Sequence, residues 1–128
     1  IGSAIYTALK NEYDVQVYDK NNPKKDRDFE ERLQTADMII GCTGKTSIPF
    51  SKYKYLKKGC VLVSASSSDR EFDAAYIRRQ SRNIQSCHDD IEAEGIVLLN
   101  CGFPVNFDGS RHSVAPNKIQ LTRHITSL

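Results

Sequence analysis

Two residues near the start of the sequence have the types and the spacing of a dinucleotide-binding turn. Gly2 stands at the head of an apolar-faced segment, and Asp19 follows 17 residues later at the end of a short apolar run. A glycine there lets a pyrophosphate approach a helix N-terminus, while the acid accepts hydrogen bonds from ribose hydroxyls. The other two glycines of a G-x-G-x-x-G motif would lie upstream of Ile1, so the alternative of an ordinary helix-start glycine and an ordinary turn acid stays open.

Asp19 also distinguishes between the two nicotinamide dinucleotides. A carboxylate accepts hydrogen bonds from two ribose hydroxyls, but it repels a 2′-phosphate. The sequence therefore favours NAD over NADP as the cofactor. Three nearby lysines argue the other way, although a solvated basic loop also accounts for them; they are Lys20, Lys24 and Lys25.

A second candidate segment, Gly41 to Ser47, combines two glycines with three hydroxyl side chains. Glycines let the backbone come close to a ligand, and the hydroxyls of Thr43, Thr46 and Ser47 offer hydrogen-bond donors. The first glycine stands only three positions before Gly44, whereas a Walker A loop has four residues between its first glycine and Gly-Lys-Ser/Thr. The phosphate-binding chemistry of an NTPase is therefore a poor fit.

The composition of the 128 residues is that of one globular domain, spanning residues 1–128. Hydrophobic residues make up 39% and charged residues 27%, which excludes disorder and fibrous repeats. The net charge of +2 is too small to attract nucleic acid without a concentrated patch, and no apolar run is long enough to cross a bilayer, so neither partner is expected. Four cysteines without metal-type spacing favour reduced thiols in a cytoplasmic protein, and no metal site is expected.

Hydrophobic periodicity predicts alternating helices and strands that would position these residues. An apolar stripe from Ile1 predicts an opening helix that lies on something buried, and a strand follows from Val15 to Tyr18. Asp28 is expected to cap the second helix. The elements after it are expected in the order strand Met38–Ile40, a short helix or turn around Pro49, strand Val61–Val63 and a third helix from Ser68 or Asp69.

The C-terminal part departs from this alternation. The segments Asn83 to Asp89 and Gly95 to Asn100 flank a short acidic connection, which suits an antiparallel hairpin better than a crossover helix. A last helix is expected after Pro116. Together the elements predict a Rossmann-like, doubly wound parallel α/β sheet that is covered on both faces, lacks its first strand, and ends in the hairpin and helix. In such sheets ligands bind at the carboxyl ends of the strands.

Two longer segments carry a family resemblance. The first, Asp37 to Ile48, reads Asp-Met-Ile-Ile-Gly-Cys-Thr-Gly-Lys-Thr-Ser-Ile, and the second, Leu56 to Asp73, ends in Ser-Ala-Ser-Ser-Ser-Asp-Arg-Glu-Phe-Asp. They resemble the NAD-binding domain of S-adenosylhomocysteine hydrolases, which carry a Thr-Thr-Gly-Asn turn and then a strand running into Gly-His-Phe-Asp-x-Glu-Ile-Asp. The later Phe-Pro-Val-Asn-Phe at 103–107 is similar to their Val-Asn-Leu segment.

The resemblance implies an NAD site built from the strand ends. It would place Gly2 against the pyrophosphate and Asp19 on the adenosine ribose. Thr43 and Gly44 would lie beside the nicotinamide ribose. Asn106 would hold the nicotinamide carboxamide, a role that suits an amide because it both donates and accepts hydrogen bonds. The expected coenzyme contacts are completed by two residues that follow the same strand ends, Lys45 and Ser66.

The implied function is to position NAD for hydride transfer with a small-molecule substrate held by an upstream domain, and the resemblance suggests a homo-oligomer. Ser67 stands where the hydrolases have histidine, which puts the hydrolase reaction itself in doubt. Two alternatives therefore stay open: a non-catalytic NAD-binding or sensing module, and the coenzyme domain of a 2-hydroxyacid-dehydrogenase-like oxidoreductase. No catalytic residue is assigned, and His112, in a glycine-containing loop, is the candidate acid or base.

Overall fold

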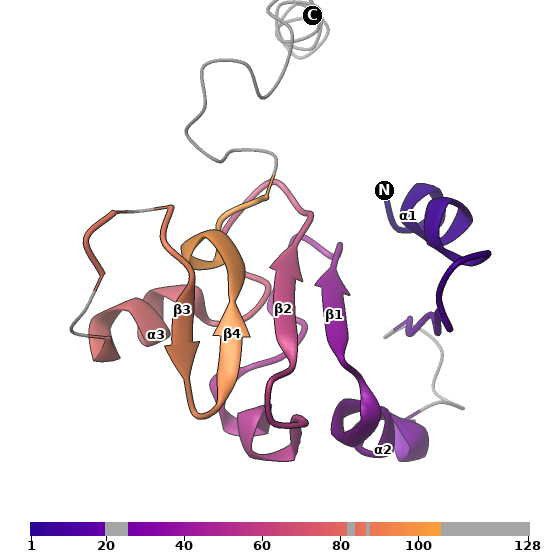
Figure 1. Cartoon of the computed structure of the whole chain (residues 1–128), viewed down its shortest axis with the longest axis horizontal. Coiled ribbons are helices and arrows are strands. Elements are labelled where there is room, and N and C mark those ends of the chain that lie inside the picture. Colours follow the sequence, from indigo (N-terminus) through magenta and orange to yellow (C-terminus); the bar gives the residue numbers. More distant parts are fainter. Residues whose placement is uncertain (20–25, 82–83, 87, 106–128) are drawn as a thin grey trace, which may run out of the picture.

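The computed structural model describes residues 1–19, 26–81, 84–86 and 88–105, and these form a mixed α/β fold. Its centre is a four-stranded open sheet with the strand order β1-β2-β4-β3 (Figure 1). The strands are β1 (Met38–Gly41), β2 (Val61–Ser64), β3 (Ile91–Ala93) and β4 (Ile96–Leu98). The described helices are α1 (Gly2–Leu9), α2 (Asp26–Thr35) and α3 (Ala74–Gln80), with 3-10 turns η2 (Phe50–Tyr55) and η3 (Leu99–Gly102).

Three of the four strands, β1, β2 and β4, run parallel. Ile39 is in register with Leu62, and Leu62 with Leu98, so these three side chains line one face of the sheet. That face is buried, since Leu62 and Leu98 are 0% and 2% exposed. The predicted strands Met38–Ile40 and Val61–Val63 are confirmed, because short apolar runs bounded by polar residues suit buried parallel strands.

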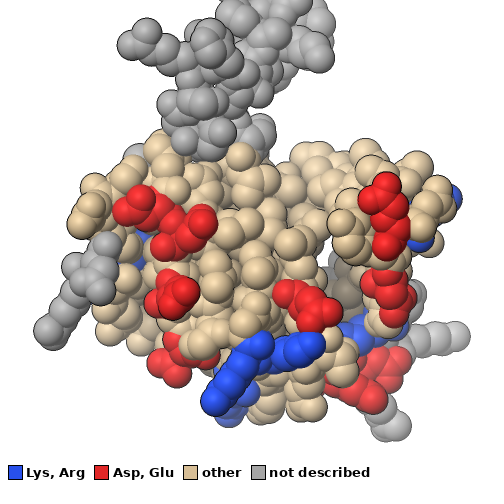
Figure 2. All heavy atoms as spheres, in the orientation of Figure 1, with Lys and Arg blue, Asp and Glu red and all other residues tan. Residues whose placement is uncertain are grey.

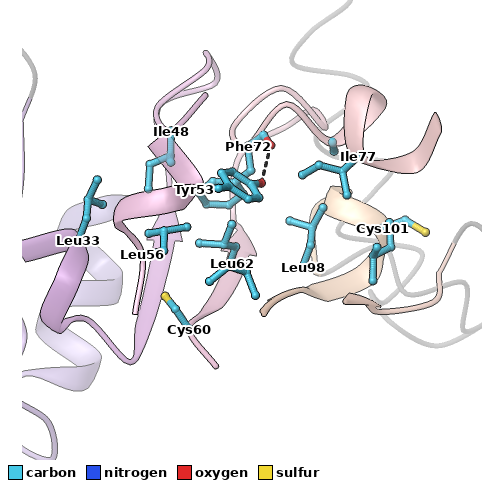
Figure 3. Packing of buried hydrophobic residues seen from close by; sticks show 13 residues of the cluster. Leu33, Ile48, Tyr53, Leu56, Cys60, Leu62, Phe72, Ile77, Leu98 and Cys101 are labelled. Carbon is cyan, nitrogen blue, oxygen red and sulfur yellow. Dashed lines mark hydrogen bonds between the residues drawn. The ribbon is translucent and has the colours of Figure 1, made fainter. Parts of the chain in front are cut away.

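One hydrophobic core joins the helices to this face. Figure 3 shows Leu33 of α2 and Ile77 of α3 on the same side of the sheet as Leu62. Tyr53 of η2 is buried in the same cluster, and its hydroxyl donates a hydrogen bond of 2.7 Å to the carbonyl of Phe72, the dashed line in Figure 3. A buried tyrosine needs such a partner for its polar end. This bond therefore links η2 to the connection that follows β2.

The opposite face of the sheet carries a second apolar row. Met38 is in register with Val61, and Val61 with Val97. Met38 is 54% exposed, and the two valines are only half-buried. The helices that contribute to the core, α2 and α3, pack on the first face. Val63, further along β2 on the same face, is 8% exposed, so in the described part of the chain this second face is covered near the carboxyl end of β2 and open near the start of β1.

Helix α1 forms where the periodicity predicts it, but none of its residues is buried. Ile1 is 74% exposed and Tyr6 is 39% exposed, so the expectation that the apolar stripe lies on a buried surface is wrong for the described residues. The predicted strand from Val15 to Tyr18 is also wrong, since residues 14–19 pair with no strand. Figure 1 shows α1 and the stretch after it beside β1, which is the edge strand of the sheet. A strand pairs its backbone groups with a neighbouring strand, whereas here the Val17 carbonyl accepts a 3.3 Å hydrogen bond from the Arg32 guanidinium and the Tyr18 ring stacks on that of Phe29.

The predicted hairpin is present, but its first strand is β3 and not Asn83–Asp89. In the antiparallel ladder Ile91 is paired with Leu98. The chain reverses at Glu94 and Gly95, whose φ angles are 54° and 76°. A two-residue turn with both φ angles positive has the twist that a tight hairpin requires. This turn fixes the register and places the first strand only a few residues before the second.

The helix starts differ from the predictions. α2 begins at Asp26, before the predicted cap Asp28, and α3 begins at Ala74 rather than after Ser68 or Asp69. The residue before α3, Asp73, has a left-handed conformation with φ of 53°, and its carboxylate accepts a 2.9 Å hydrogen bond from the amide of Phe50. Tertiary contacts therefore delay the start of α3. The last predicted helix, after Pro116, lies outside the described residues.

Two further expectations concern thiols and membranes. Cys42, Cys60 and Cys101 are free thiols, as predicted, whereas Cys87 lies outside the described residues. Within the described ranges, the search for helices with the length and apolar character to span a membrane finds none.

Candidate functional site

The carboxyl ends of three neighbouring strands meet at one edge of the sheet. The amide of Ala65, after β2, donates to the carbonyl of Gly41 at the end of β1, with an N···O distance of 2.9 Å. The amide of Val105, after β4, donates to the carbonyl of Ser64 at the end of β2, at 3.1 Å. The segments that follow β1, β2 and β4 therefore lie side by side, and we call this edge the strand-tip site.

Helix α1 brings its N-terminus to the same edge. A Cβ atom added to Gly2 would lie 3.9 Å from the Cβ atom of Cys42, the residue that follows β1. No side chain of the described residues caps this helix. Backbone N–H groups of an uncapped first turn, together with the helix dipole, favour an anion. The N-terminal end of α1 thus adds donors to the strand-tip site.

The loop after β1 is held by one residue from the connection after β2, Glu71, which is fully buried. Its carboxylate accepts hydrogen bonds from the Thr43 hydroxyl, at 3.1 and 3.0 Å to the two oxygens, and from the Gly44 amide at 2.6 Å. Its backbone carbonyl accepts from the amides of Ser47 and Ile48 at 2.9 and 3.1 Å. Glu71 therefore anchors both ends of the loop.

The space for this carboxylate comes from Gly41. A Cβ atom there would lie 2.7 Å from Glu71 Oε2 and 2.9 Å from Phe72 Cζ, closer than real Cβ contacts allow. Any larger residue at the end of β1 would push the carboxylate out of its place. The glycine that the sequence analysis read as permitting close approach of a ligand instead permits close approach of Glu71.

The hydrogen bonds to Glu71 decide which groups of the loop face outward. The donors of Thr43 and Gly44 point toward the carboxylate, while the side chain of Lys45 is exposed. At Gly44 the φ angle is +70°, and a Cβ atom added there would meet nothing within 4 Å. The outer surface of the loop is thus open space beside a glycine and a lysine ammonium.

The thiol of Cys42 borders this loop. Burial raises the pKa of Cys42, and the negative charge of Glu71 raises it further. A thiol is a nucleophile only as the thiolate, so Cys42 is unsuited to nucleophilic catalysis near neutral pH.

The loop after β2 is closed on itself. Ser66 is 7% exposed, and its hydroxyl lies 3.3 Å from that of Ser64 and donates to the carbonyl of Ser68 at 3.1 Å. The Ser66 side chain is therefore used inside the loop. The loop after β2 therefore presents backbone and small side chains at the strand-tip site.

A left-handed turn directs the chain after β4 toward the strand-tip site. Asn100, Cys101 and Gly102 have φ angles of 53°, 53° and 82°. Non-glycine residues rarely adopt this region, and where they do the surrounding contacts must hold them. The side-chain amide of Asn100 donates to the carbonyl of Pro104 at 2.9 Å, and Arg78 donates to the carbonyl of Cys101 at 2.7 Å.

Arg78 joins this turn to the β2 end of the site. Its guanidinium also forms an ion pair with Asp69 and lies 4.6 Å from the centre of the Phe103 ring. The two side chains of this pair are only 22% and 29% exposed, so water screens the ion pair less than it would a fully exposed one. Arg78 thus fixes the path of the residues that lead to Asn106.

The structure brings together most, but not all, of the predicted site residues. Those at the strand-tip site are Gly2, Thr43, Gly44, Lys45 and Ser66. Asp19 is exposed, at the end of residues 14–19, which belong to no strand. Asn106 and the candidate acid or base His112 lie outside the described residues.

Sequence reasoning missed Glu71 and the left-handed turn. One signal for Glu71 was an acid inside the run Asp-Arg-Glu-Phe-Asp, directly before the fully buried Phe72. An acid beside a core aromatic residue after a strand end suggests a buried hydrogen-bonding role. The turn at Asn100 had a weaker signal, an Asn followed two residues later by Gly102, since both types tolerate positive φ.

Comparison with known proteins finds similar sequences but no matching family model. It is 47% identical over 116 residues to uncharacterized protein MT0113 of Mycobacterium tuberculosis (strain CDC 1551 / Oshkosh), and equally to uncharacterized protein Rv0104 of strain ATCC 25618 / H37Rv. The match covers 86% of this chain and 23% of each relative, so the chain spans about a quarter of the length of these relatives.

Proposed function

We propose that this chain is an NAD-binding domain and that the dinucleotide lies across the strand-tip site. The observation that carries the proposal is the meeting of the uncapped N-terminus of α1 with the carboxyl ends of β1, β2 and β4. Crevices at the carboxyl ends of parallel strands are where open α/β sheets bind ligands, and helix N-termini there bind phosphates.

The residues present fit such a ligand. Gly2 lets a pyrophosphate approach the first turn of α1, and the open space beside Gly44 leaves room for a sugar. The ammonium of Lys45 and the compact loop around Ser66 border that space. Asn106 lies outside the described residues, and its assignment to the carboxamide of the nicotinamide rests on the family resemblance.

Asp19 is assigned to the adenosine ribose. Because its carboxylate would repel a 2′-phosphate, this assignment also implies a preference for NAD over NADP. Its assignment rests on its spacing from Gly2 and on the finer fold that we propose, a Rossmann-like doubly wound sheet. In that fold a further parallel strand, leading into α1, lies between residues 14–19 and β1. It would pair with both and bring Asp19 to the strand tips.

Three features support the additional strand. The outer edge of β1 pairs with no strand of the described residues, although β1 is apolar along its length. The apolar stripe of α1 is uncovered. Figure 2 shows the surface hollowed between the α1 side of the molecule and the body of the sheet. A strand there would run parallel to β1, because the N-terminus of α1 lies at the carboxyl end of β1.

When bound, NAD would supply hydride transfer, and the chain's part is to bind and orient it against a substrate held elsewhere in a longer protein. The parent activity is proposed to be that of an NAD-dependent, S-adenosylhomocysteine hydrolase-like enzyme. A non-catalytic NAD-binding module is the second candidate. It is favoured by the loop after β2, where Ser67 and the mutually bonded Ser64 and Ser66 offer no acid or base.

The test is calorimetric titration of the full-length protein with NAD and with NADP. We expect NAD to bind and NADP to bind more weakly; absence of NAD binding would refute the proposal. Incubation with NAD and candidate alcohols, followed by nicotinamide absorbance, then separates enzyme from sensor, because a sensor produces no reduced cofactor. Hydrogen exchange of β1 in the full-length protein tests the additional strand, whose pairing must slow exchange at the amide of Ile40, which points to the outer edge because Ile39 and Gly41 face β2.

A further inference from the structure

His88 lies beside the β4 end of the strand-tip site. It precedes β3, which runs antiparallel to β4, so the start of β3 is next to the carboxyl end of β4 (Figure 1). The amide of Asn100, after β4, donates to the carboxylate of Asp90 at 2.9 Å. The amide of Cys101 donates to the carbonyl of Asp89 at 2.7 Å. The segment before β3 is therefore tied to the same edge of the sheet as the ends of β1, β2 and β4.

A hydrogen bond to Asn100 determines which nitrogen of the His88 ring carries the hydrogen. Nδ1 of His88 lies 3.0 Å from Oδ1 of Asn100. The side-chain nitrogen of Asn100 donates to the carbonyl of Pro104 at 2.9 Å, so the atom of Asn100 that faces the ring is its oxygen, which can only accept. Nδ1 is therefore the donor, and the lone pair of the neutral ring is on Nε2.

The residue that orients this ring is itself held in place. Asn100 is 7% exposed and has a left-handed conformation, which the surrounding hydrogen bonds maintain. His88 is exposed, and among the described residues its ring forms its hydrogen bond through Nδ1 and none through Nε2. A histidine with one nitrogen fixed by a partner and the other available as a proton acceptor has the arrangement of a general base.

The proposed dinucleotide would extend toward this ring. Helix α1 and the stretch that ends at Asp19 lie on the side of β1 away from β2 (Figure 1), so the adenosine half is assigned to that side. The nicotinamide half then extends the other way, over β2 and β4. Neighbouring strands are about 4.8 Å apart, which puts β4 about 10 Å and β3 about 14 Å from β1. His88, at the β3 end, is next to the place where a substrate would meet the nicotinamide.

We infer that His88 is the catalytic acid–base residue of this site and that the substrate is an alcohol with a hydrogen on its hydroxyl-bearing carbon. The inference rests on the proposed NAD-binding function. On oxidation of the alcohol, the C–H bond breaks and its hydrogen leaves with both electrons to NAD, which is reduced. The O–H bond breaks as well, its proton passes to Nε2 of His88, and the C–O bond becomes a carbonyl. The oxygen of Asn100 stabilises the resulting imidazolium through the bond to Nδ1.

The position of His88 can be tested without turnover. Diethyl pyrocarbonate acylates unprotonated imidazole nitrogens, and mass spectrometry of the full-length protein reports the rate at His88 with and without saturating NAD. We expect NAD to slow the labelling, because its nicotinamide half would lie against Nε2. An unchanged rate in the presence of bound NAD would overturn the inference.

The chemical role is tested with His88→Asn. The amide nitrogen of Asn takes the position of Nδ1, so the variant keeps the donor to Asn100 and loses Nε2. We expect its affinity for NAD in calorimetry and its circular dichroism to match those of the wild type. Formation of NADH from S-adenosylhomocysteine or from 2-propanol, two alcohols of this class, should fall about 10²–10⁴-fold.

The outcomes separate this inference from the function on which it rests. Failure of the wild type to bind NAD refutes the proposed function itself. Where NAD binds, equal NADH formation by the wild type and His88→Asn overturns the role of His88. Formation of no NADH by the wild type from either alcohol also overturns it and leaves NAD binding established. The labelling experiment uses the wild type alone, so it decides the position of His88 even where His88→Asn fails to fold.

Discussion

Gly102 provides the most direct test of the turn that leads from β4 to the strand-tip site. It is the third of the left-handed residues, with φ of +82°, and it packs against the start of α3. A Cβ atom at this position would lie 2.3 Å from the Cβ atom of Ala74 and 3.2 Å from Leu98 Cδ2. Neither neighbour can move away easily. Ala74 is 0% exposed and has no flexible side chain, and Leu98 is 2% exposed within the core.

The loss of stability in Gly102→Ala has two parts. A non-glycine residue in the left-handed region costs about 1–2 kcal/mol. Forcing an extra methyl group into a packed core adds about 1–3 kcal/mol. We therefore expect the free energy of unfolding to fall by about 2–5 kcal/mol, a large share of the stability of a small domain.

Gly59 supplies a matched control. Its φ is +81°, almost the same as that of Gly102, but a Cβ atom there would meet nothing within 4 Å. Gly59→Ala should lose only the backbone part, about 1–2 kcal/mol. The gain from a stiffer unfolded chain is common to both variants and cancels in the comparison.

Urea unfolding of both variants and the wild type, followed by circular dichroism, measures the difference. An unchanged m-value makes the midpoints directly comparable. Equal losses in Gly102→Ala and Gly59→Ala would refute the tight packing of the turn on α3. Such a result would also count against the described path of the chain from this turn to Val105, whose amide is bonded to Ser64.

Three further predictions address the core, the cofactor and the thiols. Tyr53→Phe removes the donor to the buried carbonyl of Phe72 and should lower the free energy of unfolding by about 1–3 kcal/mol in urea; no change would show that water replaces it. Asp19→Ala in the full-length protein should weaken NAD binding by at least about 1 kcal/mol in calorimetry, and an unaltered affinity would count against the ribose assignment. Burial raises the pKa of Cys60 to about 11 from 9.0, so the folded thiol stays protonated while the unfolded one ionises. Stability should therefore fall as the pH rises from about 9 to 11, less steeply in Cys60→Ala, and identical pH profiles would contradict this.

The parallel strands were predictable from the sequence because their signal is local. Met38-Ile-Ile and Val61-Leu-Val are short apolar runs, each followed by a glycine or by small polar residues. Such runs have few alternatives to a buried strand. The sequence therefore predicts the loops that follow them as site segments, and both loops lie at the strand-tip site.

Other features depend on contacts that the local sequence does not encode. Glu71 lies 28 residues after Thr43, and only the pairing of β1 with β2 brings them together. The hairpin register follows from positive φ at Glu94 and Gly95, and a Glu in that conformation is uncommon enough that the turn was not recognised. The start of α3 is delayed because the burial of Phe72 outweighs a good capping residue upstream.

The errors on the N-terminal side have a different physical origin. The stripe of α1 and the run from Val15 to Tyr18 have the patterns of a covered helix and a paired strand, yet no residue of α1 is buried and residues 14–19 belong to no strand. Both features border the outer edge of β1, where Met38 is 54% exposed, and the run from Val15 to Tyr18 contacts α2 through the stacked rings of Tyr18 and Phe29 rather than through a strand. The additional strand proposed above would account for both wrong predictions together, since it would cover the stripe of α1 and pair with the run from Val15 to Tyr18.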